Sequence, residues 1–573
     1  MPAIISEKFR IFNAKQFIES FTEAENTVSW FFVGRPQRWD SYLEIYSLTA
    51  TAINVGDVVY VGSDLGSATF RGTVREVYQN SLMLYDVTGT PTVGDVLKVS
   101  GVAVAKTGIF RFATDDTPPY PSDNQSEKYN IFDDIIAAKK ISADNVSVVV
   151  PRYNFSQGSV YDMWKPDYSG GISGGVGKTT STGFDNLYGS SKYYAMTNDF
   201  RVWMCIQNSG GTTGATDEPV TSGPNWDSST GIYTQADGVY SWKFMYKIDT
   251  NEVVRFMSSE FIPVIKMEST YADWANYVVV DGAIYAYTIE DPGAGLNDAT
   301  YYAPVNGDGT GAIAEITVSG GEITKVLPHT YGTGYTYGSI KIAAGTGSGA
   351  DAIGFFDSAA FNNPANPGNS AASIEVIIPP QGGYASDAQI QLNGKRIMTN
   401  VRIAADEGSG DFPVDNDFRR IGIVQDLYSG GALATDDTLS GLITIRITGN
   451  ASGAAYTPDE VVTQDLGNSQ TAKGTVVSWS VDVDNDNAVG TLKIFQSPEY
   501  HLDNGVVRSF SASSSNPVIN VSNTTTGTID AGSGGVTPSE IDNNKGDVVY
   551  IENRRLITRS ADQIEDIKLV VEF

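Results

Sequence analysis

The sequence predicts a mainly β protein of several domains, built as β-sandwiches and small barrels with a few short helices and three inserted β-rich domains. The chain has 573 residues, more than one ordinary core can organise. Charged residues make up only 18%, whereas Gly (59) and Tyr (30) are frequent, which is typical of strands joined by many turns. Short apolar runs of strand length recur between Gly, Asn and Asp, which favours small barrels or sandwiches.

Changes in residue composition and apolar patterning along the chain predict one framework interrupted by insertions. The framework comprises residues 1–45, 112–270, 388–427 and 541–573. The insertions are a small β-barrel at 46–111, a Gly-rich β domain at 271–387 and a second small β-barrel at 428–540. Insertion at loop tips is tolerable because the entropy cost of closing a loop grows slowly with its length.

Helical spacing of apolar residues occurs in two framework segments. FRIFNAKQFIESF at 9–21 and KYNIFDDIIAAKKI at 128–141 both predict helices. NVSVVVPRYNF at 145–155 predicts a buried strand, and the Gly/Ser/Thr-rich residues 166–190 predict a long loop.

Internal similarity links several of the inserted blocks. The blocks 46–111 and 428–540 both run from a Val-Val pair through a polar loop to Gly-Thr-Val, which predicts two copies of one barrel type. Within 271–387, the passages 306–326 and 345–359 each lead from a Gly-rich turn into alternating small and apolar residues, which predicts a degenerate repeat.

Charge and cysteine content exclude several classes of function. The net charge of −29 disfavours binding to nucleic acid or to an anionic membrane. Cys205 is the single cysteine and His329 and His501 are the two histidines, so no intrachain disulfide can form and a His/Cys zinc site is nearly excluded. We expect no signal peptide and no membrane-spanning helix.

The motif GGVGKTT at 174–180 is similar to a phosphate loop, in which Lys178 would contact phosphates and Thr179 would hold magnesium. No strand precedes it and no apolar helix follows, so we interpret it as a surface loop.

Asp482, Asp484 and Asp486 alternate as in a calcium loop. However, Asn487 and Lys493 occupy the places that require Gly and Glu, which favours a hairpin tip. Adjacent carboxylates are frequent enough by composition to carry little information. We therefore predict no catalytic residue, no cofactor, no metal and no enzymatic activity.

Several framework stretches together resemble a known family. The C-terminal stretch GDVVYIENRRLITRSADQIEDIKLVVEF carries Tyr550, Glu552, Asn553 and Arg554. KFR at 8–10, FFVGRPQRW at 31–39, PPYPSD at 118–123 and DFRRIGIVQD at 417–426 precede it. In this order they resemble the T4-type phage baseplate wedge protein of the gene product eight family. The three β-rich insertions depart from that family.

The resemblance implies a structural subunit of a contractile tail that lies in the virion baseplate and is assembled in the host cytoplasm. It implies a homodimer within each wedge and contacts with other wedge proteins. It implies no catalysis and no cofactor.

Five residues of the resembling stretches are candidates for framework or interface contacts: Arg35, Trp39, Glu552, Asn553 and Arg554. Glu552 and Arg554 lie on one face of a predicted strand because side chains alternate. They could pair across subunits, but a local contact near a sheet edge is favoured because most polar pairs on strands are local.

Two other functions remain open from the sequence. Gly-rich β insertions and numerous tyrosines would suit a receptor-binding tail adhesin, although no repetitive fibre shaft is evident. A capsule polysaccharide depolymerase would need paired carboxylates across a cleft, which sequence alone cannot place. Whether the insertions bind glycans is left open.

Overall fold

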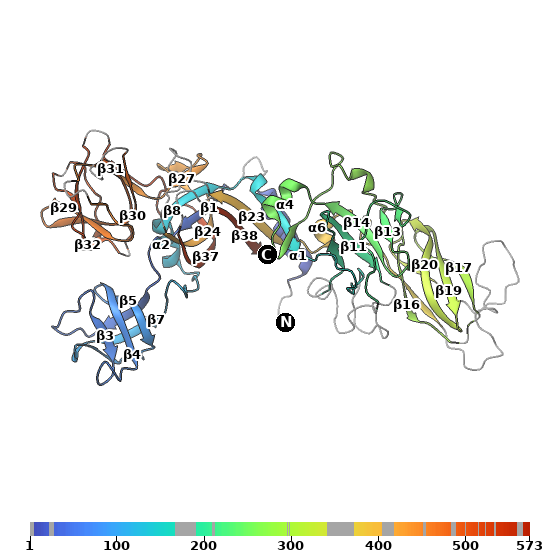
Figure 1. The fold of residues 1–573 in the computed structure, drawn as a ribbon, viewed down its shortest axis with the longest axis horizontal. Coiled ribbons are helices and arrows are strands. Elements are labelled where there is room, and N and C mark those ends of the chain that lie inside the picture. The colour runs from blue at the N-terminus through green and yellow to red at the C-terminus, as the bar shows by residue number, and fades with distance from the viewer. Residues whose placement is uncertain are drawn as a thin grey trace. The chain divides into compact units, whose positions relative to one another are not determined.

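In the computed structural model, the chain folds into two compact units (Figure 1). Unit 1 contains Met1–Ser20, Asp144–Asn400 and Lys568–Phe573, and unit 2 contains Phe21–Ala143 and Val401–Ile567. The structure describes residues 5–21, 28–166, 191–208, 213–294, 296, 298–340, 372–403, 417–450, 454–482, 489–498, 500–513, 515–521, 523–531, 534–558 and 565–573. The predicted mainly β, multidomain class is confirmed. The pieces predicted as one framework are distributed over both units.

A five-stranded sheet forms the centre of unit 2, in the order β27-β8-β1-β24-β37. Its strands are β1 (Ser29–Gly34), β8 (Ile135–Lys140), β24 (Asp417–Gln425), β27 (Thr438–Ser440) and β37 (Asp547–Thr558). Every residue of β1 is buried, as expected for a central strand that is covered on both faces. Trp30, Phe32 and Ile135 belong to one apolar core at this sheet.

The first barrel closes in the order β2-β5-β4-β3-β6-β7. Its strands are β2 (Ser41–Tyr46), β3 (Val58–Val61), β4 (Phe70–Val77), β5 (Ser81–Gly89), β6 (Val96–Val99) and β7 (Val102–Arg111). Leu43, Val59, Phe70 and Leu84 are fully buried, because alternate side chains of each strand point into the barrel.

A second six-stranded ring runs β28-β31-β30-β29-β34-β35 and closes where β35 pairs with β28. Its strands are β28 (Ile443–Thr448), β29 (Val461–Gly467), β30 (Gln470–Val481), β31 (Val489–Phe495), β34 (Val518–Asn520) and β35 (Thr526–Ile529). When the six strands of each barrel are counted in chain order, both rings read first, fourth, third, second, fifth, sixth. The prediction of one repeated barrel type is therefore confirmed at the level of topology.

Short strand pairs complete unit 2. They are β25 (Tyr428–Ser429) with β26 (Ala432–Leu433), β32 (Leu502–Asp503) with β33 (Val506–Val507), and β36 (Val536–Thr537) against β28.

Unit 1 contains a sheet in the order β10-β11-β14-β13-β12. Its strands are β10 (Tyr194–Met196), β11 (Arg201–Gln207), β12 (Trp226–Asp227), β13 (Ile232–Thr234) and β14 (Ser241–Lys247). Trp203, Trp242 and Tyr246 are fully buried here. Edge-to-face contacts among such rings stabilise beyond the area they bury, so this core is dominated by aromatic packing.

A further sheet, most of whose residues belong to unit 1, has the order β15-β9-β23-β38. Its strands are β9 (Val146–Pro151), β15 (Phe261–Pro263), β23 (Arg396–Ile403) and β38 (Glu565–Glu572). Helix α1 (Glu7–Glu19) is capped by the Ser6 side chain, and its Phe17 ring lies 5.5 Å from that of Phe573. The first and last described segments of the chain therefore meet in unit 1.

The Gly-rich region of unit 1 forms β17 (Ala299–Pro304), β19 (Thr310–Ser319) and β20 (Glu322–Thr333) in one sheet. It also forms the pairs β16 (Tyr287–Asp291) with β22 (Ser373–Val376), and β18 (Asn306–Gly307) with β21 (Gly338–Ser339). The second passage of the predicted repeat, 345–359, lies outside the described residues. The remaining helical segments are α4 (Thr250–Phe256), α6 (Ala388–Gln391), η1 (Ala143–Asn145) and η2 (Trp274–Asn276).

The helix predicted at 128–141 is wrong in its second half. Helix α2 (Gln125–Asp134) ends where β8 begins at Ile135. Ile135, Ile136, Ala137 and Ala138 are all buried, since β8 lies between β1 and β27. A short run that is apolar at every position fits a buried strand as well as a helix, and the sheet partners decide between them.

Candidate functional site

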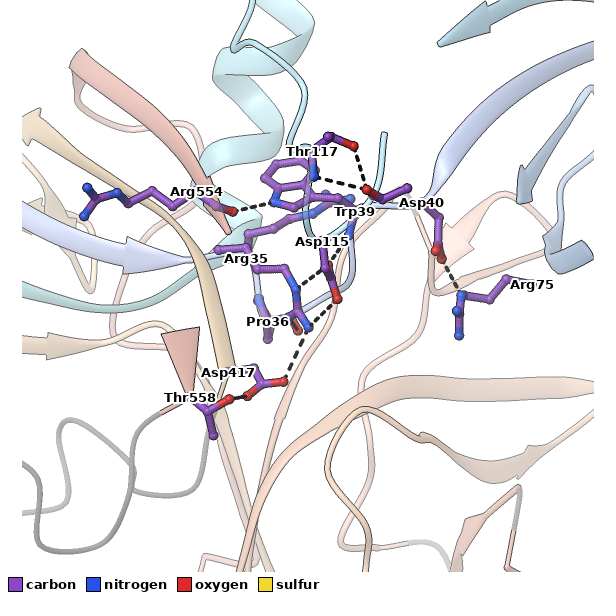
Figure 2. Close-up of polar contacts among 12 residues, drawn as sticks. Arg35, Pro36, Trp39, Asp40, Arg75, Asp115, Thr117, Asp417, Arg554 and Thr558 are labelled. Atoms are coloured by element: carbon purple, nitrogen blue, oxygen red, sulfur yellow. Dashed lines mark hydrogen bonds and ion pairs between the residues drawn. The ribbon is translucent and has the colours of Figure 1, made fainter. Parts of the chain in front are cut away.

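The five framework or interface candidates lie in unit 2, at or beside a polar cluster that we call the junction. Figure 2 shows Arg35, Trp39 and Arg554 of these candidates. The junction comprises Arg35, Trp39, Asp115, Asp134, Arg419, Arg420 and Asn553. It lies where the two connections of the first barrel leave the sheet, since β1 ends at Gly34 and β7 ends at Arg111.

Arg35 follows β1 in a left-handed conformation, with a φ of 59°. The preceding Gly34 is required there, because a Cβ atom would lie 2.7 Å from the carbonyl oxygen of Asp134. Arg35 is buried, with 6% of the residue exposed. Its guanidinium donates to the Asp134 carboxylate at 3.2 Å and to the Tyr500 hydroxyl at 2.6 Å. Arg35 therefore connects the sheet to the second barrel's Tyr500.

Trp39 lies in the connection to the first barrel, and its backbone N–H donates to Asp115 at 2.9 Å. Its indole N–H donates to the Arg554 carbonyl at 3.0 Å (Figure 2). The guanidinium groups of Arg35 and Arg420 lie 4.8 Å and 5.5 Å from its ring centroid. Cation–π attraction is strongest where water is excluded, so Trp39 fixes this connection against β37 and two buried cations.

Arg419 is fully buried. It donates to Asp115 at 2.9 Å and 3.4 Å, and also to the Pro36 carbonyl. Asp417 lies 3.4 Å from the same guanidinium and accepts a hydrogen bond from Thr558 at 2.7 Å. Because Pro36 and Asp115 belong to the two connections of the first barrel, one arginine of β24 holds both of them.

Arg420 points to the other face of β24, since neighbouring side chains on a strand alternate. It donates to Asn553 at 2.9 Å and to Asp134 at 3.4 Å. The Asn553 amide in turn donates to the Pro119 carbonyl at 2.9 Å. Asp134 is 1% exposed and accepts from both Arg35 and Arg420, so one buried carboxylate serves two arginines.

Glu552 and Arg554 lie beside the junction on β37, the edge strand of the sheet, and pair with each other at 3.1 Å. Both are partly exposed. The Tyr550 hydroxyl donates to Glu552 at 3.1 Å, and burial together with that carboxylate raises the pKa of Tyr550 to about 12. Glu552 and Arg554 thus form the local pair within one chain that the sequence favoured. A contact of either residue with another subunit stays a prediction.

At the first barrel itself, Arg75 of β4 lies 2.5 Å from the Asp40 carboxylate (Figure 2). Burial raises the pKa of Asp40 despite the opposing attraction of Arg75. Arg75 thus offsets part of the cost of burying this carboxylate.

The junction is built to hold geometry. Arginine does not release its proton in proteins, and the guanidinium groups here are already hydrogen-bonded to carboxylates and carbonyls. Removing one partner of a buried ion pair is strongly destabilising, whereas an intact pair adds little net stability. The arrangement thus fixes how the first barrel and the sheet connect.

Sequence reasoning missed Arg419, Arg420, Asp115, Asp134 and Tyr500. Two adjacent arginines inside the apolar run of DFRRIGIVQD were an available signal, because a strand buried on both faces cannot leave either charge unpaired. Their partners were not predictable, since Asp115 and Asp134 are distant along the chain.

Within the described residues, the other sequence motifs form no second site. The phosphate-loop-like motif at 174–180, Asp484 and Asp486 lie outside the described residues. Asp482 is paired with Arg446, with one bond of 2.8 Å. In the described part of the chain, no group of three or more His, Cys, Asp or Glu side chains is arranged to hold a metal ion. Likewise, no described helix has the length and apolar character needed to cross a membrane.

Comparison with known proteins does not identify the chain. No protein-family model matches the sequence, and no curated protein matches it.

Proposed function

We propose that this chain is a structural baseplate wedge subunit of a contractile-tailed phage. In this role it is a homodimer that assembles with other wedge proteins in the host cytoplasm and remains in the virion. It binds neither nucleic acid nor membrane, needs no cofactor and catalyses no reaction.

The observation that supports the proposal is the convergence of the resembling segments. FFVG lies on β1, DFRRIGIVQ on β24 and DVVYIENRRLIT on β37, and these strands are hydrogen-bonded neighbours. PPYPSD joins them through the Pro119 carbonyl, which accepts a hydrogen bond from Asn553. Segments separated by hundreds of residues along the chain resemble the family in order, and they also share one sheet and one polar cluster.

The junction suggests how such a subunit would act. A baseplate rearranges between two states, and a subunit that transmits the change must move as a body while its contacts with neighbours switch. Buried, directional ion pairs resist relative motion because breaking one leaves a charge in a dry environment. In unit 2, Arg419 would keep the first barrel fixed to the sheet during the change.

The test is to purify contractile tails from the phage that encodes this chain and to examine them by mass spectrometry and cryo-microscopy. The proposal predicts the chain in the baseplate, as a dimer in each wedge. Absence from purified tails would overturn it, and so would recovery as a trimeric fibre at the tail periphery. The latter result would favour the receptor-binding adhesin. Release of reducing sugar from host capsule by the pure chain would favour the depolymerase.

A further inference from the structure

A cavity of about 400 Å³ lies in unit 1, lined by residues of the segment 152–161 and by Lys192. We call it the Arg152 pocket. Its volume falls within the range of small-molecule sites. The proposed structural role does not use it, so a ligand for this pocket would be an additional property of the chain.

The walls of the Arg152 pocket are held by the backbone. The N–H of Arg152 donates to the Glu260 carbonyl at 2.7 Å, and the N–H of Phe155 donates to the Met196 carbonyl at 2.8 Å. The Tyr161 hydroxyl accepts from the N–H of Ser156 at 2.7 Å. A pocket whose walls are already ordered costs little conformational entropy when a ligand enters.

Two cations border the pocket without a carboxylate partner among the described residues. Arg152 donates from Nε to the Asn154 amide oxygen and from Nη1 to the Ser258 carbonyl, both at 2.9 Å. The Lys192 ammonium lies 5.8 Å from the centroid of the Tyr153 ring. The Asp162 carboxylate lies near Lys192, but it accepts a hydrogen bond from the Lys192 backbone N–H, at 2.9 Å, and not from the ammonium group.

Arg152 and Lys192 both line this one pocket. Two such cations on one pocket make a local site for an oxyanion, because charge-assisted hydrogen bonds to carboxylate, sulfate or phosphate are stronger than neutral ones.

The rest of the lining is neutral and rich in hydrogen-bonding groups. Tyr153, Ser156 and Ser159 supply hydroxyl groups and Asn154 supplies an amide, with Val160 as an apolar neighbour. These hydroxyl and amide groups can form hydrogen bonds with the hydroxyl groups of a polyol, and the two cations beside them can bind one acidic group on the same molecule. We propose that the Arg152 pocket binds an acidic monosaccharide unit, a sugar ring bearing a carboxylate, sulfate or phosphate.

Binding is measured on the full-length protein by calorimetry and by saturation-transfer NMR, with glucuronate, glucose 6-phosphate, glucose and inorganic sulfate as probes. Glucuronate and glucose 6-phosphate should bind saturably, and glucose about tenfold or more weakly, because it lacks the charged group. An oligosaccharide with a terminal glucuronate distinguishes a glycan end from a free sugar acid as the source.

Lys192→Met should weaken glucuronate binding about tenfold, the usual worth of a hydrogen bond to a charged group. Lys106→Met, on β7 of the first barrel, is the matched control and should leave the affinity unchanged. Ser156→Phe places a ring in the pocket from an exposed position and should abolish binding even if the lysine variant fails to fold.

The proposal is overturned if glucuronate does not bind, or if glucose binds equally well. It is also overturned if sulfate alone binds as tightly as the acidic sugars, which would indicate an oxyanion site without sugar recognition. Binding of a short Glu-rich peptide in place of the sugars would assign the pocket to a protein partner and would equally overturn it. None of these results depends on whether the chain is found in tails.

Discussion

The two barrels of unit 2 have the same strand order but are attached to the rest of the unit by different interactions. Around the first barrel, ion pairs hold the connections: Arg419 with Asp115, and Arg75 with Asp40. Around the second barrel, the N–H of Gly441 donates to the Ile136 carbonyl at 2.8 Å, and the neutral Tyr500 hydroxyl accepts from the Arg35 guanidinium at 2.6 Å. The strand order of each barrel thus depends on the alternate side chains that fill its interior. The attachment of each barrel to the rest of unit 2 depends on a few residues outside that interior.

The two barrel regions also differ in histidine content. No histidine occurs in the first barrel, whereas His501 is buried beside the second. Its Nδ1 accepts from the N–H of Ser497 at 3.0 Å, so the neutral ring carries its proton on Nε2, which lies 3.0 Å from the Thr475 hydroxyl. Burial lowers the pKa of His501 to about 4. Acid should therefore affect the second barrel before the first.

The largest effect is expected from Arg419→Met. The change leaves Asp115 and Asp417 without the buried guanidinium, at a cost of about 3–5 kcal/mol in the free energy of unfolding of unit 2. Chemical denaturation followed by tryptophan fluorescence measures this loss. Adding Asp115→Asn should recover part of it, because one uncompensated charge is removed. A loss below about 1 kcal/mol would mean that the junction does not hold the first barrel.

A pH effect should follow from His501. Its pKa is lower in the folded than in the unfolded state, so its stabilising contribution is complete above pH 6.5 and is lost as the pH falls towards 4. The full loss approaches about 3 kcal/mol. Urea midpoints between pH 7 and pH 4 should fall less steeply in His501→Gln than in the unchanged protein. Parallel slopes would contradict a neutral buried ring.

Tyr500→Phe should have a smaller effect. It removes the hydroxyl that accepts from Arg35 at 2.6 Å but keeps the ring, whose centroid lies 5.3 Å from the guanidinium. The expected loss is about 1.5 kcal/mol, the worth of a hydrogen bond to a charged group. Thermal unfolding compares it with Tyr500→Ala, which loses the ring as well. Equal losses for the two variants would show that the hydroxyl, not the ring, carries the contact.

The smallest effect is expected from Arg446→Met. Arg446 pairs with Asp482 on the second barrel, where both side chains are about one-third exposed. Exposed ion pairs contribute about 0–1 kcal/mol because water screens them. The same denaturation assay should show little change. A loss comparable with that of Arg419→Met would remove the distinction between buried and surface pairs.

Local patterns in the sequence predicted much of this fold. Short apolar runs between turn residues predicted the barrel at 46–111, and the similarity of the block 428–540 to it predicted the second barrel, because strand length and turn composition are local properties. The boundary at Ile135 was not predictable, since strand β8 depends on β1 and β27. Glu552 and Arg554 followed from alternation within one strand. The pairing of Arg419 with Asp115 joins residues about 300 positions apart, which no local pattern contains.

The proposed role of unit 2 requires the first barrel to be fixed to the sheet, and a distance measurement tests this most directly. Cysteines at Val93 and Leu433, both at least half exposed, can carry spin labels, while the native Cys205 is buried and should not react. Pulsed electron resonance should give one narrow distance distribution, which broadens in Arg419→Met. A broad distribution in the unchanged protein, or no effect of the arginine variant, would contradict the rigid attachment.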